Sequence, residues 1–513
     1  MAGAGVQEAD MAENSVRRAT DSSVLWTFTI LLMVAGPTVV ADAADDRKML
    51  TVGVAETEIT PPVGFPIAGY YHERLAEGSI DPLKAKAIVL RDGDTVAALV
   101  VCDLIGIATD LSREVSRRVS EETDIPEANI VISATHTHTA PDYMKELWLY
   151  LGEAPQDRLR ADYIQELING LVAVIGQADS DCRPATLATG AAEQTTPVAF
   201  NRRFVMRDGS VRTWQSYSNP EVIRAAGPID PQIGLLVVRD PENGDVRGVL
   251  SNFALHLDTV GGQRWSADYP FFIERVLREA VGPNVISIFG TGCCGDINHV
   301  DPSRSERNSA DFIGSSIGTS IVEELDRLTP VEETTLTVKS EVVNLPLQEV
   351  TADDVARSVR VLESANSGED VDFFDHVTAY KMMMLDQLQH EEPSANAPEH
   401  MTWGLSRSLS GTGDTLPVDV TTITIGSEVA IVCLPGEVFV ELGLAIKQAS
   451  PFRTTLVIEL SDAVETIYIP HRAAYAGGSY EVTNSAVQPG SGEMLVESAL
   501  RLLREAASGV IQP

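Results

Sequence analysis

Two histidines separated by one residue, His136 and His138, follow a β-branched run over residues 130–132. Side chains of an extended chain repeat every two residues, so both imidazoles are expected on one face at the carboxyl end of a strand. In open α/β sheets, ligands bind at that end. The spacing by itself is compatible with a metal site and equally with a structural pair that caps a strand.

A third histidine, His256, ends another apolar run, residues 248–255. Taken alone it is best explained as a core histidine with satisfied hydrogen bonds. Because histidines end two separate predicted strands, however, a shared site becomes more plausible than it is for His256 alone.

A carboxylate and a glycine-rich turn also follow predicted strands. Glu437 lies between a strand at 429–434 and a helical stretch at 438–447, a position suited to a ligand or base, or to a carboxylate at a helix N-terminus. The segment 290–295 matches the glycine pattern of dinucleotide-binding proteins, but a loop follows it where that motif requires a helix. We therefore interpret it as a turn that presents Asp296.

The elements that must position these residues alternate along the chain, which predicts an α/β or α+β fold. We expect one large mixed-sheet domain flanked by helices, with the metal site at strand carboxyl ends, and no internal repeat is evident. A less organised excursion is expected near 364–413. The predicted strands are 85–90, 96–102, 129–133, 234–238, 248–255, 284–289, 421–425 and 429–434, and the predicted helices are 160–177, 310–328 and one opening at Pro270.

Composition excludes several classes of protein. The 513 residues are 44% hydrophobic and 22% charged, as in folded globular proteins, and carry a net charge of −36. Such an acidic chain would repel phosphate backbones, so no nucleic-acid partner is expected. Five cysteines are too few for a disulfide scaffold, and the adjacent Cys293 and Cys294 receive no role.

The N-terminal residues 1–43 are predicted to form a signal peptide. Arg17 and Arg18 precede an apolar run, 24–41, and a small-residue cleavage signature that ends at Ala43. A retained anchor is the alternative, but Gly36 and Pro37 leave the run short of the ~20 apolar residues that a span needs. We predict a secreted or periplasmic protein with no membrane span after cleavage; the oligomeric state is left open.

With these residues in view, the chain resembles the neutral/alkaline non-lysosomal ceramidases, zinc amidases that cleave ceramide. The matching motifs occur in the family's order across most of the chain. They are 53–64 (GVAETEITPPVG), 68–70 (AGY), 81–83 (DPL), 133–138 (SATHTH), Asn201-Arg202, 253–256 (FALH), Gly295-Asp296, 435–437 (PGE) and a tyrosine block at 468–481. The resemblance implies one zinc hydrolase domain over 44–513, acting on ceramide or a related lipid or small-molecule N-acyl amide.

Carried over by position, the resemblance implies a zinc ion held by His136, His256, Glu437 and Tyr468, and catalytic roles for His138, Arg202 and Tyr480. Zinc lowers the pKa of bound water toward ~7, which supplies a nucleophile for amide hydrolysis. His138 would transfer the proton, and the other two catalytic residues would stabilise the oxyanion. Asp103, Asp296 and Asn298 are candidates for the shell of residues behind the ligands, with Asp103 expected to orient a histidine.

The sequence departs from the family pattern in three places. Asn298 occupies the position of the family's active-site serine, which excludes a serine nucleophile. Leu257-Asp258 replaces proline and a small polar residue after His256. A helical stretch at 495–506 soon follows the tyrosine block, so the family's C-terminal immunoglobulin-like domain is not expected. A zinc hydrolase of another small amide or an ester is therefore the main alternative, and a non-catalytic binding protein the lesser one.

Overall fold

The computed structural model describes residues 50–152, 157–395 and 405–510. The predicted signal peptide, 1–43, lies outside these residues. Residues 48–513 form one compact unit. Within the described ranges, none of the helices combines the length and the apolar character needed to cross a membrane.

Most strands belong to three mixed sheets. The first has the order β5-β4-β3-β1-β6, the second β15-β13-β12-β7-β17 and the third β18-β19-β20-β22. The α/β class is thus confirmed, although the strands divide among three sheets where the sequence suggested one. Their bounds are β1 Thr51–Glu58, β3 Lys84–Asp92, β4 Thr95–Cys102, β5 Ile130–Ala134, β6 Arg183–Pro184, β7 Thr186–Glu193, β12 Gln232–Arg239, β13 Val246–Phe253, β15 Ile286–Thr291, β17 Thr329–Pro330, β18 Leu336–Pro346, β19 Thr415–Ile425, β20 Val429–Cys433 and β22 Thr454–Ile458.

One topology recurs in all three sheets. Three antiparallel strands lead into a crossover helix and then into a fourth strand that is parallel to the third. A second helix then packs on the first two strands of the same sheet. The crossover helices are α1 (Thr109–Glu122), α4 (Tyr269–Val281) and α9 (Val440–Ala449), and the second helices are α3 (Arg158–Ser180), α5 (Ala310–Glu324) and α11 (Ser491–Val510).

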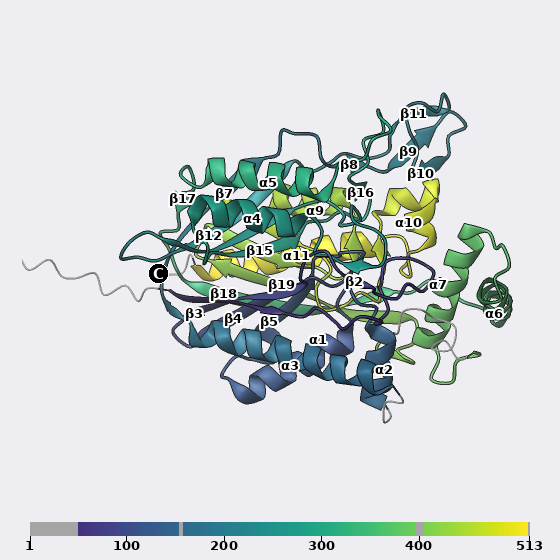
Figure 1. The fold of residues 1–513 in the computed structure, drawn as a ribbon, viewed down its shortest axis with the longest axis horizontal. Coiled ribbons are helices and arrows are strands. Elements are labelled where there is room, and N and C mark those ends of the chain that lie inside the picture. Colours follow the sequence, from purple (N-terminus) through teal and green to yellow (C-terminus); the bar gives the residue numbers. More distant parts are fainter. Residues whose placement is uncertain (1–49, 153–156, 396–404, 511–513) are drawn as a thin grey trace, which may run out of the picture. The chain divides into compact units, whose positions relative to one another are not determined.

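This repeat was missed in the sequence because it lies in the order and direction of the strands, while the residues at equivalent positions differ. Figure 1 shows the α4–α5 pair on one side of the strands and the α1–α3 pair on the opposite side. The other elements are β2 (Gly78–Ser79), β8 (Phe200–Asn201), β9 (Arg203–Met206), β10 (Val211–Thr213), β11 (Val222–Ala225), β14 (Arg264–Trp265), β16 (Ile297–Asn298), β21 (Glu437–Val438), β23 (Tyr468–Ile469), α2 (Met144–Gly152), α6 (Ala352–Asn366), α7 (Phe373–Gln389), α10 (Tyr480–Thr483) and the 3-10 helices η1 (Glu127–Asn129), η2 (Arg407–Leu409) and η3 (Arg472–Gly477).

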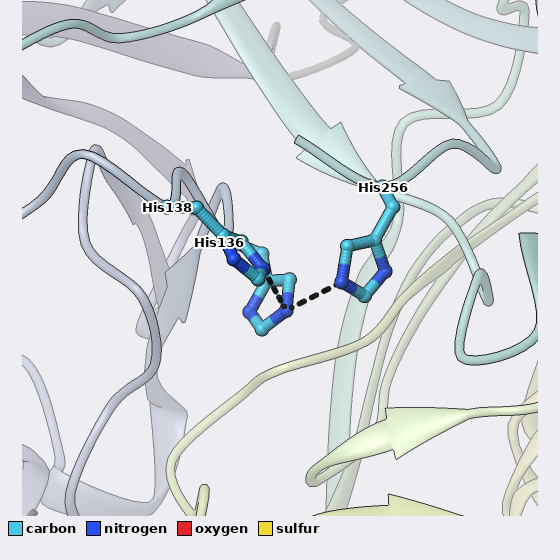
Figure 2. Close-up of side chains that lie close together, drawn as sticks. All are labelled: His136, His138 and His256. Carbon is cyan, nitrogen blue, oxygen red and sulfur yellow. Dashed lines mark hydrogen bonds between the residues drawn. The ribbon is translucent and has the colours of Figure 1, made fainter. Parts of the chain in front are cut away.

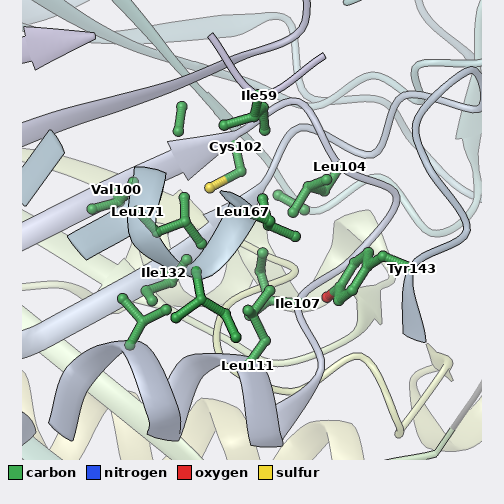
Figure 3. Packing of buried hydrophobic residues seen from close by; sticks show 14 of the residues in the cluster. Ile59, Val100, Cys102, Leu104, Ile107, Leu111, Ile132, Tyr143, Leu167 and Leu171 are labelled. Atoms are coloured by element: carbon green, nitrogen blue, oxygen red, sulfur yellow. The ribbon is translucent and has the colours of Figure 1, made fainter. Parts of the chain in front are cut away.

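Each sheet is buried on both faces, which explains its nearly continuous apolar strands. In β4, Val100 and Cys102 pack with residues of α1 and α3, as Figure 3 shows. The alternate residues Leu99 and Val101 point the other way, into a central core shared by all three sheets. This shared core fixes the sheets relative to one another, and therefore also the ends of their strands.

Glu274, on the crossover helix α4 of the second sheet, forms nearly buried ion pairs with Lys84 and Lys86 of β3 in the first sheet. Burial by itself would raise the pKa of Glu274, but the two lysines lower it from 4.5 to about 2. The folded state therefore favours the ionised carboxylate. This contribution is complete above pH 4.5 and is lost as the pH falls toward 2.

We expect Glu274→Gln to lower the free energy of unfolding at pH 7 by about 3 kcal/mol, because it leaves the buried Lys86 ammonium without its partner, while Lys84 keeps its ion pair with Glu56. Chemical denaturation at several pH values measures the difference, which should shrink between about pH 4.5 and 2. Asp162→Asn, in an exposed pair with Arg158, is the control and should change stability by less than about 0.5 kcal/mol. A difference that is independent of pH would contradict the assignment.

Candidate metal centre and active site

The candidate site lies where the carboxyl ends of the fourth strands of the three sheets meet. The hydroxyl of Thr291, at the end of β15, donates to the carbonyl of Thr135 at 2.9 Å. The Glu459 amide, after β22, donates to the Thr291 carbonyl at 3.0 Å, and the Ala134 amide donates to the Leu460 carbonyl at 3.1 Å. The loops that leave β5, β15 and β22 are therefore tied together directly beneath the site.

Three imidazoles converge above this junction, as Figure 2 shows. The Nε2 atom of His136 lies 3.1 Å from Nε2 of His256 and 3.4 Å from Nε2 of His138. His136 and His256 are buried, and the side chain of His138 is 14% exposed. Among the described residues, these three histidines form a group whose ligand atoms lie close enough together to hold one metal ion.

The backbone of His136 differs from the sequence-based expectation. Strand β5 ends at Ala134, and His136 has a left-handed conformation with φ of 73°. Such a conformation costs a residue with a side chain of order 1–3 kcal/mol and persists only where the surroundings impose it. Here the His136 amide donates to the Leu104 carbonyl at 2.9 Å. The two imidazoles meet because the chain turns after the strand, and the extended period of two residues is not the cause.

Glu437 adds a carboxylate oxygen to the histidine nitrogens of the cluster. His136 Nδ1 donates to the carbonyl of Ile105 at 2.5 Å, so Nε2 is the ring nitrogen that faces the cluster. Glu437 Oε2 lies 3.3 Å from that nitrogen and 3.8 Å from Nε2 of His256, and it has no hydrogen-bond donor although it is buried. A buried carboxylate oxygen beside imidazole lone pairs requires a cation, so these residues fit a metal ion.

Tyr468 lies beside Glu437 because the short strands β21 and β23 pair these two residues. Arg202 donates from Nη2 to the Tyr468 hydroxyl at 3.0 Å and to the Gly295 carbonyl at 2.7 Å. Burial raises the pKa of Tyr468 well above its ordinary value, and the positive charge of Arg202 opposes that shift. The pairing therefore places a phenol, a carboxylate and a guanidinium side by side.

Tyr480 borders the same group of side chains. Its ring centroid lies 5.5 Å from that of Tyr468, and its hydroxyl lies 3.4 Å from the hydroxyl of Tyr71. All seven residues assigned to zinc or catalysis from the resemblance are thus brought into one neighbourhood. They come from segments more than 340 residues apart in sequence, from His136 to Tyr480.

Asp103 does not contact a histidine through its hydrogen bonds. Its carboxylate accepts from the amide of Lys84 at 2.8 Å and from the hydroxyl of Thr135 at 3.2 Å. The orienting contact to His136 comes from the Ile105 carbonyl. A backbone carbonyl in the loop after β4 cannot be recognised from residue type, which is why the sequence pointed to the nearby carboxylate.

Asp296 and Asn298 brace the loop after β15. The carboxylate of Asp296 accepts from the side-chain amide of Asn201 at 2.7 Å and from the Val440 amide at 2.9 Å. Burial raises the pKa of Asp296 to about 6. Asn298 accepts from the Val300 amide at 3.2 Å. These contacts shape the loop from behind the histidines.

Glu481 is a residue of the site that the sequence did not reveal. It is fully buried, and its carboxylate accepts from Arg202 Nε at 2.8 Å and from Arg203 Nη1 at 2.9 Å. It therefore fixes the guanidinium that reaches Tyr468. The sequence shows only that Arg202 and Arg203 are adjacent; their burial, which requires an anionic partner, is evident from the structure.

A buried thiol and carboxylate lie behind His256. Cys294 Sγ lies 3.1 Å from Glu459 Oε1 and 3.9 Å from His256 Nδ1. The other oxygen of Glu459 accepts from the Val438 amide at 2.6 Å, next to Glu437. The described cysteines carry no disulfide. This pair supports the strand that presents the Glu437 carboxylate.

Gly69 supports His138 through close packing. A Cβ atom added at Gly69 would lie 2.8 Å from His138 Cβ, and the residue has φ of +100°. We expect Gly69→Ala to displace His138 and to lower kcat by at least about tenfold, since positioning errors of about 1 Å are costly. Steady-state kinetics and thermal unfolding measure the change.

Gly64→Ala is the matched control for this prediction. Gly64 has a similar φ of +90°, but a Cβ atom there would meet nothing within 4 Å. It should show the strain of about 1–2 kcal/mol and leave kcat unchanged. Equal kcat losses in both variants would contradict the packing role of Gly69.

The fold and this cluster define a mixed α/β protein with a buried histidine and carboxylate site suited to a metal ion. The family model for "Neutral/alkaline non-lysosomal ceramidase, N-terminal" matches residues 50–264. The N-terminal half of the chain is therefore similar to the neutral/alkaline ceramidases. Glu437, Tyr468 and Tyr480 lie beyond the matched residues. Their assignment to the site therefore rests on their positions in the structure.

One curated relative and two solved structures are similar to the chain. A "Neutral ceramidase" from Mycobacterium tuberculosis (strain ATCC 25618 / H37Rv) is 28% identical over 225 residues, which are 40% of this chain and 32% of the relative. The neutral ceramidase structure from Pseudomonas aeruginosa matches with a TM-score of 0.64 at 17% identity, covering 91% of this chain and 76% of the other. A second structure, "Ceramidase complexed with C2", matches with a TM-score of 0.63 at 18% identity, covering 89% and 76%. At these identities the two structures establish the shared fold.

Proposed function

We propose that the chain is a zinc-dependent hydrolase that cleaves the amide bond of ceramide or of a related N-acyl amide. The observation that carries the proposal is the convergence of His136, His256 and Glu437 on one point, with a carboxylate oxygen that lacks a donor. Similarity to the neutral/alkaline ceramidases supports the reaction class.

His136, His256, Glu437 and Tyr468 would hold the ion. Bound zinc would polarise the amide carbonyl and lower the pKa of a water molecule toward ~7. Histidine, carboxylate and phenolate are nitrogen and oxygen donors of the kind that zinc accepts. Arg202, 3.0 Å from the Tyr468 hydroxyl, favours the deprotonated form that a ligand must have.

His138 is the residue placed to move protons. Burial lowers its pKa to about 4, so its imidazole is neutral at pH 7 and can accept a proton. Its Nε2 atom faces the ligand cluster at 3.4 Å from His136 Nε2. The same ring would return the proton to the nitrogen of the departing amine.

Arg202 and Tyr480 would stabilise the oxyanion that develops on the amide carbonyl. Arg202 is held by Glu481 and the Gly295 carbonyl, so its positive charge needs no rearrangement during the reaction. A preorganised donor of this kind lowers the activation barrier by about 3–4 kcal/mol.

The test is to incubate the protein, with and without a zinc chelator, with ceramide and a panel of other N-acyl amides and esters. Mass spectrometry of the released amine or alcohol identifies the substrate. We expect amide hydrolysis that the chelator abolishes and added zinc restores. Turnover of short amides or esters without ceramide would exclude ceramide as substrate and keep the hydrolase, whereas chelator-resistant activity would exclude the metal role.

We also propose that the protein is exported by cleavage after Ala43. The support is the arginine pair, the apolar run and the small-residue signature of the sequence. Expressed with its full N-terminus, the exported protein should begin Ala44-Asp45-Asp46 by N-terminal sequencing. Recovery in the cell fraction with residues before Ala43 intact would contradict export.

A further inference from the structure

Asp258 is one of the residues at which this chain departs from the ceramidase pattern, and the fold brings it to the candidate catalytic residue His138. The His138 amide donates to the Leu257 carbonyl at 3.1 Å, which ties the loops after β5 and β13 together. Asp258 Oδ1 consequently lies 3.8 Å from His138 Nδ1. A negative charge that the family pattern does not require therefore stands beside the reaction centre.

A second segment that departs from the ceramidase pattern contains His299. His299 follows Asn298, is buried, and its Nδ1 atom has no hydrogen-bond partner among the described residues. Burial lowers the pKa of His299 to about 4, and the carboxylate of Asp258 opposes that shift.

Asp258 is fixed in position and still accessible. The Tyr70 hydroxyl donates to Asp258 Oδ1 at 3.2 Å, and the Arg74 guanidinium lies 4.1 Å above the Tyr70 ring. The side chain of Asp258 is 36% exposed. Both of its close contacts use Oδ1, which leaves Oδ2 able to accept a hydrogen bond from a ligand.

The distance between the two side chains argues against a hydrogen bond that would orient the His138 ring. At 3.8 Å, Asp258 and His138 are too far apart for a hydrogen bond, and a carboxylate that oriented the ring would lie nearer 2.8 Å. A carboxylate accepts hydrogen bonds and donates none, so its partner must carry a hydroxyl or an ammonium group.

We propose that Asp258, held by Tyr70, is a specificity-determining residue that selects substrates with a hydroxyl or ammonium group next to the scissile amide. The inference rests on the proposed function and names the substrate class of that site. A site built to bond such a group discriminates strongly against analogues that lack it, because its polar atoms would otherwise lose their water without replacement.

The test compares three N-acyl amides with the same acyl chain, made from a plain alkylamine, an amino alcohol and a diamine. Wild-type enzyme should prefer one of the two polar substrates by about tenfold to a hundredfold in kcat/KM. Asp258→Ala should abolish that preference through KM and change the alkylamide by less than about twofold. Asp258→Asn should retain more of a preference for the hydroxyl than for the ammonium, because its amide oxygen still accepts a bond.

Tyr70→Phe should weaken the preference partially, and Asp208→Ala, an exposed carboxylate in the turn between β9 and β10, is the control that should leave all three rates unchanged. An equal loss of kcat on all three amides in Asp258→Ala would show that Asp258 acts through His138 and would overturn the proposal. So would a wild-type enzyme that hydrolyses the three amides equally.

Calorimetric binding of the free alkylamine, amino alcohol and diamine to the zinc-loaded protein separates this proposal from the proposed function. If no amide is cleaved but a polar amine binds more tightly than the alkylamine, and Asp258→Ala removes the difference, the hydrolase proposal fails and the selective subsite stands. If amides are cleaved without such a difference, the subsite fails and the hydrolase stands.

Discussion

His136→Ala is expected to remove both zinc binding and hydrolysis. Nε2 of His136 is the centre of the cluster, 3.1 Å from Nε2 of His256, 3.4 Å from Nε2 of His138 and 3.3 Å from Glu437 Oε2. Without it, the remaining donors no longer surround one point. We expect zinc content to fall from about one ion per chain to a small fraction, and kcat/KM to fall by about a thousandfold or more, since the metal supplies several kcal/mol of transition-state stabilisation.

Metal analysis by mass spectrometry and kinetics on the amide that wild-type enzyme prefers measure the two effects together. His390→Ala is the control, because His390 is half exposed and pairs with Asp386 away from the cluster. It should retain zinc and activity. Full activity in His136→Ala would reject the metal assignment, and zinc retained without activity would show that His136 serves chemistry more than binding.

Glu481→Gln is expected to have the largest effect on stability. The carboxylate is fully buried between two guanidinium groups, accepting from Arg202 at 2.8 Å and from Arg203 at 2.9 Å, and also from the Thr213 hydroxyl at 2.7 Å. Glutamine has almost the same shape but carries no charge, so it leaves two buried cations without compensation. Breaking a buried pair in this way costs about 3–5 kcal/mol.

Activity should fall together with stability, because Arg202 loses the contact that holds it against Tyr468. Denaturant unfolding and kinetics at a temperature where the variant stays folded separate the two effects. Glu121→Gln removes a carboxylate from an exposed pair with Arg117 and should cost less than about 0.5 kcal/mol. A Glu481→Gln variant as stable and active as wild type would contradict both the ion network and its role in positioning Arg202.

Local patterns in the sequence were sufficient to predict the α/β class and the position of the chemistry at strand ends. Strands such as β4 and β20 are short β-branched runs buried on both faces, and burial of that kind leaves a nearly continuous apolar signal. His136 and His256 were visible because each directly follows such a run. Local pattern also indicated Glu437, between a strand and a helix. Motifs that occur in the family's order added Tyr468 and Tyr480 and connected all three residues to the histidines.

Tertiary structure decided how these pieces combine. The division into three sheets of equal topology depends on strand pairing between residues far apart, and pairing leaves no trace in residue identity. The left-handed turn at His136, the Ile105 carbonyl that holds its ring and the burial of Glu481 between two arginines arise from contacts between separate segments of the chain. Short-range sequence determines which segments are apolar and extended, whereas the distances between side chains at their ends follow from long-range packing, and those distances define the site.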